Sequence, residues 1–222
     1  MFISHKYRLI FVHIQRTGGN SIYQEFARYD LYLQNKLPFK ADFKRFKHPY
    51  AIDIKQVLAA EIFDNYIKFA VVRNPFDRLV SWYSMFKHKT IDKTLIPREQ
   101  YPEMANMGEA VEEAFEHYVK SFEDFIKLSP YQANGLFTRF HTPQRAFVCD
   151  EEGRLLVNKI LRFETLSTDF LTLAKEISFE GHLSQVNASI REQNYRSYYN
   201  EDLKKQVTDR FKVDLDYFGY DF

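Results

Sequence analysis

The segment Gln15–Ser21, with the sequence QRTGGNS, combines two adjacent glycines with side chains that bind anions. Gly18 and Gly19 allow the backbone to approach an oxyanion closely. An apolar run at 7–14 precedes the segment, and a helical pattern at 20–29 follows it. A loop between a buried strand and a helix presents N–H groups at the helix start, where phosphate groups bind. Candidate ligand-binding residues are therefore Gln15, Arg16, Thr17, Gly18, Gly19, Asn20 and Ser21.

This segment departs from the P-loop consensus of nucleotide kinases and NTPases. No glycine stands five positions before Gly18 or Gly19, and no lysine follows either of them. A nucleotide kinase of similar fold is therefore the weaker alternative. The other alternative is a glycine turn that binds nothing, in which Asn20 or Ser21 caps the following helix.

Arg73 and Ser81 form a second candidate phosphate site. Arg73 directly follows the apolar run at 66–72, and Ser81 lies eight residues further on, about two helical turns. Pro75 is suited to the start of the intervening helix. A guanidinium group offers paired donors that match phosphate oxygens, so both residues can hold one phosphate if the strand end and the helix face converge. Otherwise Arg73 pairs with Asp77, and Ser81 is a neutral helix position.

The elements that must position these residues alternate along the chain between strands and helices. This order is typical of a three-layer α/β domain with a central, mostly parallel sheet flanked by helices, here a single domain over 1–222. Besides the elements named above, we predict helices at about 52–63, 76–86, 110–128, 168–177 and 201–211, and a hairpin pairing 145–149 with 154–163 around the turn DEEG.

Composition excludes several classes of protein. The chain has 222 residues, of which 45% are hydrophobic, 27% charged and 17% aromatic, which excludes disorder and collagen-like repeats. Its formal net charge of +1 argues against a nucleic-acid-binding protein that is basic all over. This value conceals a charge of +4 over 36–48 and of −6 over 98–124. A lone cysteine, Cys149, and the lack of a signal segment or a transmembrane run favour the cytoplasm.

Taken together, the motifs resemble the PAPS-dependent sulfotransferase superfamily, on its carbohydrate (heparan sulfate 2-O-sulfotransferase-like) side. The segment IFVHIQRTGGNSI resembles the loop that binds the 5′-phosphosulfate of the donor PAPS (3′-phosphoadenosine 5′-phosphosulfate). FAVVRNPFDRLVSWY resembles the segment that binds its 3′-phosphate. The resemblance continues through KHPYAIDIK, TPQ, ILRFETL, NASIRE and FGYDF, and so covers most of the chain.

The resemblance implies a P-loop-like fold and a role for each motif. Gln15–Ser21 would bind the 5′-phosphosulfate, and Arg73 and Ser81 the 3′-phosphate. Residues in 187–191, including Ser189 and Arg191, would lie over the nucleotide. The family usually has Lys at the position of Arg16 and commonly Pro at that of Gln15. This departure keeps open a non-catalytic relative that binds PAP or a glycan.

The implied reaction is sulfuryl transfer from PAPS to a hydroxyl, with PAP as the second product and no metal. Arg16 would stabilise the leaving phosphate, and His48 would take the proton from the acceptor. His48 is the candidate base because it precedes the helix leading to the second strand, where relatives place a catalytic His. The alternatives are that His48 only extends the basic segment, or that Glu25 or Asp53 is the base.

The acceptor implied by the family is a carbohydrate or another hydroxyl compound. The basic segment before His48 favours an anionic acceptor. Phe39, Phe43 and Phe46 alternate with its charges, and they either stack on sugar rings or face the core of an amphipathic helix. His13, within the first predicted strand, reads as a core histidine.

Overall fold

The computed structural model describes residues 1–33, 48–88, 102–183 and 194–222. The predictions for the basic segment, its three phenylalanines, Ser189 and Arg191 fall outside these residues. The chain divides into two compact units. Unit 1 comprises Met1–Arg73 and Gln144–Asn187, and unit 2 comprises Asn74–Pro143 and Ala188–Phe222. The single domain over 1–222 stays a prediction.

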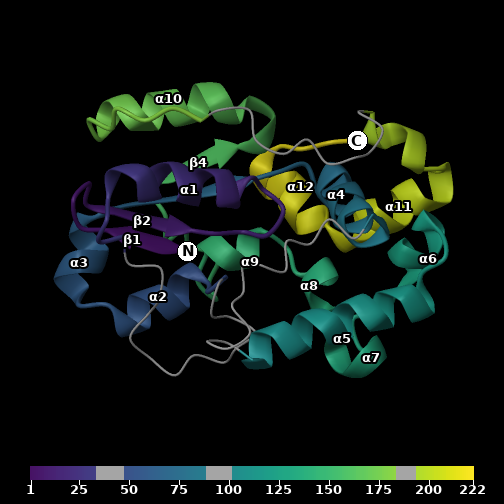
Figure 1. Ribbon diagram of the computed structural model, residues 1–222. Coiled ribbons are helices and arrows are strands. Elements are labelled where there is room, and N and C mark those ends of the chain that lie inside the picture. Colours follow the sequence, from purple (N-terminus) through teal and green to yellow (C-terminus); the bar gives the residue numbers. More distant parts are fainter. Residues whose placement is uncertain (34–47, 89–101, 184–193) are drawn as a thin grey trace. The chain divides into compact units, whose positions relative to one another are not determined.

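Unit 1 contains a sheet of four strands in the order β1-β2-β3-β4 (Figure 1). Strands β2 (Leu9–Val12), β3 (Ile67–Val72) and β4 (Lys159–Arg162) run parallel, and β1 (Phe2–Ser4) is antiparallel to β2. The predicted α/β class with a mostly parallel sheet is therefore confirmed. The carboxyl ends of β2, β3 and β4 share one edge of the sheet, where such folds bind ligands.

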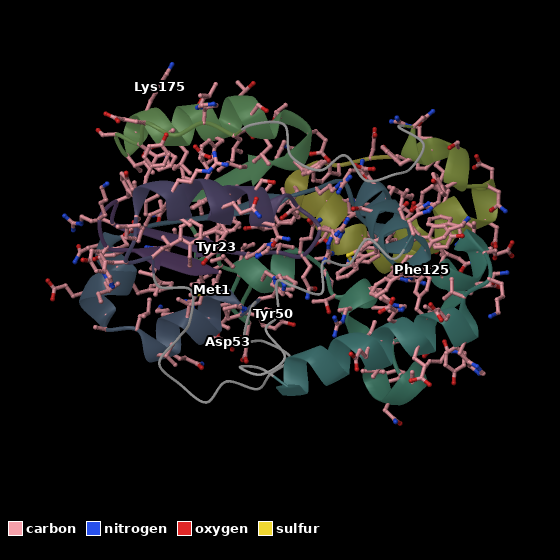
Figure 2. The ribbon with its side chains drawn as sticks, in the orientation of Figure 1. Met1, Tyr23, Tyr50, Asp53, Phe125 and Lys175 are labelled. Carbon is pink, nitrogen blue, oxygen red and sulfur yellow. The ribbon has the colours of Figure 1, made fainter. Side chains whose placement is uncertain are left out.

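Helices cover both faces of this sheet (Figure 1). Alternate strand residues, among them Phe11 and Phe69, pack with Phe26 of α1 (Gly19–Tyr29) and Phe170 of α10 (Leu166–Glu176). The other face is covered by α2 (Ala51–Val57), α3 (Ala60–Asn65) and α9 (Arg145–Val148). Tyr50 and Asp53 mark the first turn of α2 (Figure 2), where the Tyr50 N–H donates to the Asp53 carboxylate at 3.0 Å.

The predicted hairpin is wrong in its first arm. Residues Arg145–Val148 form a helical turn, because the N–H of Cys149 donates to the carbonyl of Arg145 at 3.0 Å. A single bridge, Cys149 to Leu155, is the antiparallel pairing recorded around the turn DEEG, and β4 pairs with β3. An apolar run of four residues fits a strand and a buried helical turn equally well, which explains the error.

Unit 2 is helical in its described residues. It contains α4 (Pro75–Lys87), α5 (Pro102–Tyr118), α6 (Phe122–Lys127), α7 (Gln132–Gly135), α8 (Thr138–His141), the 3-10 turn η3 (Tyr195–Tyr198), α11 (Glu201–Arg210) and α12 (Lys212–Phe218). The buried face of α4 packs against aromatic residues such as Phe115, Phe125 and Phe140. This unit therefore has its own hydrophobic core, separate from the core around Phe26.

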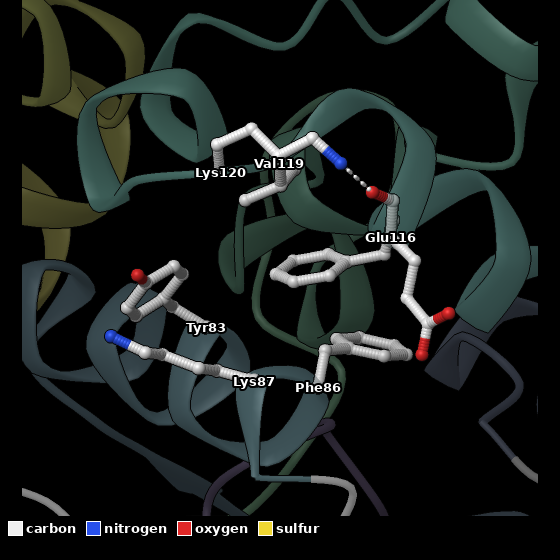
Figure 3. Close-up of a pocket in the computed structure, with 7 residues that line it drawn as sticks. Tyr83, Phe86, Lys87, Glu116, Val119 and Lys120 are labelled. Atoms are coloured by element: carbon white, nitrogen blue, oxygen red, sulfur yellow. Dashed lines mark hydrogen bonds between the residues drawn. The ribbon is translucent and has the colours of Figure 1, made fainter.

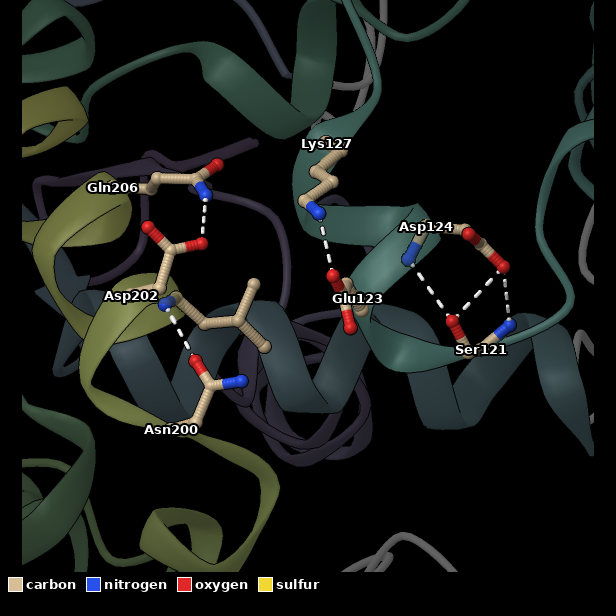
Figure 4. Close-up of polar contacts among 8 residues, drawn as sticks. Ser121, Glu123, Asp124, Lys127, Asn200, Asp202 and Gln206 are labelled. Carbon is tan, nitrogen blue, oxygen red and sulfur yellow. Dashed lines mark hydrogen bonds and ion pairs between the residues drawn. The ribbon is translucent and has the colours of Figure 1, made fainter.

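Side-chain caps mark the starts of α6 and α11 in unit 2 (Figure 4). The Ser121 hydroxyl accepts the N–H of Asp124 at 3.1 Å, and the Asp124 carboxylate accepts the N–H of Ser121 at 2.8 Å. This reciprocal capping box starts α6 and divides the helix predicted over 110–128. At the start of α11, the Asn200 side chain accepts the N–H of Leu203 at 2.8 Å, a cap made by one hydrogen bond.

Across the described parts of the chain, none of the helices has both the length and the apolar character needed to cross a lipid bilayer.

Candidate functional site

The loop between β2 and α1 has an irregular backbone. Arg16 has a φ of 67° and Gly18 a φ of 83°, both in the left-handed region. Gly18 is the N-cap of α1, and its carbonyl accepts the N–H of Ser21 at 3.1 Å. No side chain caps the helix, so the prediction that Asn20 or Ser21 does so is wrong. The N-cap residue, Gly18, therefore offers no side chain to the first N–H groups of α1, which also have no intrahelical acceptor.

Packing within unit 1 explains the residue types of this loop. A Cβ atom on Gly19 would lie 2.1 Å from the Cδ2 and Nε2 atoms of His13, so only glycine fits beside that ring. The Thr17 hydroxyl donates to the carbonyl of Ile14 at 2.9 Å and is buried. Thr17 and Gly19 therefore shape the loop from inside, while Asn20 is exposed at its surface.

Arg73 brings a positive charge to this loop from the carboxyl end of β3. Its Nη1 donates to the carbonyl of Arg16 at 3.0 Å. Its guanidinium carbon lies 3.9 Å from the ring centre of Phe163, which begins the 3-10 turn η2 (Phe163–Thr165) after β4. Unit 1 therefore brings the glycine loop and Arg73 together. The ends of β2, β3 and β4 all contribute to it.

Gln144 holds the backbone of Arg73. Its Oε1 accepts the N–H of Arg73 at 2.9 Å, and its Nε2 donates to the carbonyl of Arg73 at 2.7 Å. The Gln144 side chain is fully buried, so these two bonds satisfy polar groups that water does not reach.

His48 lies beside the strand that leads into the loop. Its Nδ1 is 2.9 Å from the carbonyl oxygen of His13, and the two imidazole rings are 4.5 Å apart between centres. A carbonyl oxygen only accepts hydrogen bonds, so Nδ1 of His48 carries the proton. In the neutral imidazole the lone pair is then on Nε2, the atom that can accept a proton.

The remaining predicted residues are not brought to this loop by unit 1. Ser81 belongs to unit 2, where it is buried on α4. Arg162, at the end of β4, donates its backbone N–H to the carboxylate of Asp169 at 2.8 Å.

Unit 2 contains an open cavity of about 220 Å³ between α4 and α5 (Figure 3). Lys120 Nζ donates to the carbonyl of Glu116 at 2.6 Å there, and Lys87 Nζ lies 5.3 Å from the ring centre of Tyr83. The cavity is lined by Tyr83, Phe86, Lys87, Phe115, Glu116, Val119 and Lys120. None of the predicted site residues lines this cavity.

Within the described ranges, no three His, Cys, Asp or Glu side chains gather closely enough to hold a metal ion.

Comparison with known families decides the relationship of this chain. The model of a family described as "Sulfotransferase family" matches residues 1–221. The chain belongs to the sulfotransferase family. Searches of curated proteins and of solved structures gave no match. The resemblance inferred from the two phosphate motifs is confirmed for the superfamily, and sulfuryl transfer is the chemistry of that family.

Two residues that support this candidate site have no signal in the local sequence. Gln144 was noticed only as part of TPQ, because a contact with a residue 71 positions away leaves no local pattern. Phe163 reads as a core aromatic, and its stacking on Arg73 depends on the order of the strands. His13 was recognised as a core histidine, and its burial confirms this, but its contacts with Gly19 and His48 were not foreseen.

Proposed function

We propose that this protein transfers a sulfuryl group from PAPS to a hydroxyl of a carbohydrate acceptor. The observation that carries the proposal is the hydrogen bond from Arg73 Nη1 to the carbonyl of Arg16, because it puts a cation of β3 beside the glycine loop of β2. The uncapped start of α1 adds N–H groups and the positive end of its dipole. This donor set fits a ligand with more than one anionic group.

Each residue then has a defined task. The loop Gln15–Ser21 binds the 5′-phosphosulfate, and Arg16 stabilises the charge on the departing phosphate. Arg73 binds the 3′-phosphate, and the assignment of Ser81 to the same phosphate stays a prediction from the sequence. The fixed position of Arg73 supports this assignment, since a preorganised cation loses little entropy on binding.

His48 is the proposed general base. The acceptor hydroxyl attacks sulfur opposite the departing phosphate, and its proton passes to Nε2 of His48 as the new O–S bond forms and the bridging S–O bond breaks. The hydrogen bond from Nδ1 to the His13 carbonyl supports this role, because it holds the tautomer whose Nε2 accepts a proton.

A transfer assay tests the proposal directly. Labelled sulfate should pass from PAPS into at least one member of a panel of saccharides that includes heparan sulfate and desulfated forms. PAP should also raise the melting temperature of the protein. Stabilisation by PAP without transfer to any acceptor would point to a non-catalytic binding protein, whereas binding of ATP-Mg in place of PAP would point to a kinase.

Arg16 can be tested in the same assay. We expect Arg16→Lys, which restores the residue usual in the family, to transfer sulfate at least as fast as the wild type. The uncharged variant Arg16→Met should be slower by about 100-fold, the size expected for one lost charge-stabilising donor. Equal rates for Met and Lys at this position would remove Arg16 from the reaction.

A further inference from the structure

Just beyond the end of β3, the backbone N–H and carbonyl of Arg73 form hydrogen bonds with a side chain and not with a neighbouring strand. The last registered pairs of β3 are Ala70 with Val12 of β2 and Val72 with Arg162 of β4. Arg73 therefore lies one residue beyond the ladder, and it is buried, with 3% of its surface exposed. Its N–H and carbonyl need partners there, because an unpaired buried backbone group is costly.

Gln144 supplies both partners. Its side-chain amide accepts the N–H of Arg73 at 2.9 Å and donates to the carbonyl of Arg73 at 2.7 Å. The amide thus replaces the backbone hydrogen bonds that a residue of a neighbouring strand would form. This contact fixes the backbone from which the guanidinium of Arg73 extends. With Phe163 under the guanidinium and Arg16 accepting from Nη1, the position of the cation is determined at both ends.

Gln144 is in turn held in place by the folded core of unit 1. Gln144 is the N-cap of α9, and its carbonyl accepts the N–H of Phe147 at 3.0 Å. The buried ring of Phe147 packs against Tyr50 at a centre distance of 4.8 Å. The amide is thus carried by a short helical turn that is anchored on α2.

We propose that Gln144 is a positioning residue that sets the selectivity of the site for a nucleotide 3′-phosphate. This inference rests on the proposed function, since it assigns Arg73 to that phosphate. Gln144 acts only through Arg73. Without the Gln144 side chain, Arg73 keeps its charge, but its backbone is no longer held in position. The affinity for a ligand with a 3′-phosphate should therefore fall relative to the affinity for a ligand without one.

The experiment compares the affinities of PAP and of adenosine 5′-phosphate, which lacks the 3′-phosphate, by calorimetry. Gln144→Met keeps the length of the side chain and removes both hydrogen bonds. We expect the preference for PAP to fall roughly fivefold to tenfold, the size of one or two such bonds, while the affinity for adenosine 5′-phosphate changes less than about threefold. Gln144→Glu, which keeps the acceptor and loses the donor, should also reduce the preference.

Two controls separate this role from general stabilisation. Gln24→Met, on the exposed face of α1 in the same unit, should leave the preference unchanged. In an Arg73→Ala background, Gln144→Met should cause no further loss of preference, because the two residues act as one unit. A variant that lowers the melting temperature but retains the wild-type preference would overturn the inference and leave the proposed function intact. A wild-type protein without preference for PAP would overturn both.

Discussion

At the scale of single residues, Arg73 connects what the sequence shows as two separate motifs. Its guanidinium contacts the loop through Arg16 and the end of β4 through Phe163. Arg73 therefore contributes to the shape of the loop as well as to its charge.

Removing this side chain tests both contributions. Arg73→Ala should weaken the binding of PAP by about 30-fold to 100-fold, the size of hydrogen bonds from a charged group. The affinity for adenosine 5′-phosphosulfate, which has no 3′-phosphate, should fall only by about fivefold, through the lost contact with Arg16. Calorimetric titration of the two ligands gives both values. Equal losses would contradict the assignment of Arg73 to the 3′-phosphate.

Removing the proposed base should affect turnover alone. His48→Ala should lower the turnover number by about 100-fold to 10,000-fold, the usual contribution of general base catalysis, and leave the affinity for PAP unchanged. His48→Asn is the sharper variant, since an amide still donates to the His13 carbonyl but takes no proton at neutral pH. His117→Ala, at an exposed position of α5, serves as the control. Full turnover in His48→Asn would exclude His48 as the base.

Candidate residues for the chemistry of this site are easier to find in the sequence than the residues that support them. Arg16, Gly18 and Arg73 carry local signals, because glycine patterns and strand ends are visible in a few neighbouring residues. The side chain of Gln144 and the ring of Phe163 gain their roles only when β3 and β4 become neighbours. That pairing joins residues about 90 positions apart, and single-sequence patterns do not encode it.

At the scale of elements, the turn from β2 into α1 is the feature on which the site depends. The start of α1 packs against the buried ring of His13, and that ring packs against His48. The loop and the proposed base are therefore joined through one histidine.

A single methyl group tests this connection. Gly19→Ala should destabilise the protein by about 1–3 kcal/mol and reduce turnover, because the new Cβ would lie 2.1 Å from the His13 ring and forces it to move. Chemical denaturation measures the first effect and the transfer assay the second. Gly108→Ala on α5 is the matched control, since its Cβ would meet nothing within 4 Å. Gly108→Ala should stabilise by about 0.5–1 kcal/mol. A Gly19→Ala protein as stable as the wild type would contradict the packing argument.

Two of the predicted helices are divided in the structure, and only one of the divisions has a signal in the sequence. The helix expected at 52–63 divides at Leu58 and Ala59, which have extended ψ angles of 150° and 134°. Both residues favour helix, so tertiary packing overrides local propensity there. The division before α6 has a readable signal, the S-x-x-D box at Ser121. The strand β1 was missed because three residues are too few to show a period.

At the scale of the whole molecule, the aromatic excess divides between two hydrophobic cores. Phe11, Phe26 and Phe69 belong to unit 1, and Phe115, Phe125 and Phe140 belong to unit 2. The acidic residues of 98–124 that the structure describes lie mostly on the exposed face of α5, whose buried face contains Val111 and Phe115. Composition alone predicted a large core but not that it is divided.

Stability should depend on pH through a buried group of unit 2. Burial, and then the cation of Arg210, lower the pKa of His141 from its ordinary value of 6.5 to about 4. The unfolded chain therefore binds this proton more readily than the folded protein, and stability falls as the pH decreases from about 6.5 to about 4. With allowance for partial exposure, the contribution is roughly 1–2 kcal/mol.

The measurement is chemical denaturation at pH 7 and at pH 4.5. His141→Gln should lose less stability between these values than the wild type, whereas His117→Gln should lose the same amount as the wild type. The physical reason is that Nε2 of His141 is buried and has no hydrogen-bond partner among the described residues, so a proton on it has no acceptor. Parallel pH curves for wild type and His141→Gln would refute this origin of the acid sensitivity.

The chain leaves unit 1 after Arg73 and returns to it at Gln144, and these are the two residues joined by the amide contact. The intervening segment is thus closed at its base by its own flanking residues. The entropy of closing such a loop depends only weakly on its length. Insertions and deletions between these two points can therefore change the helices of unit 2 without displacing the cation at the end of β3.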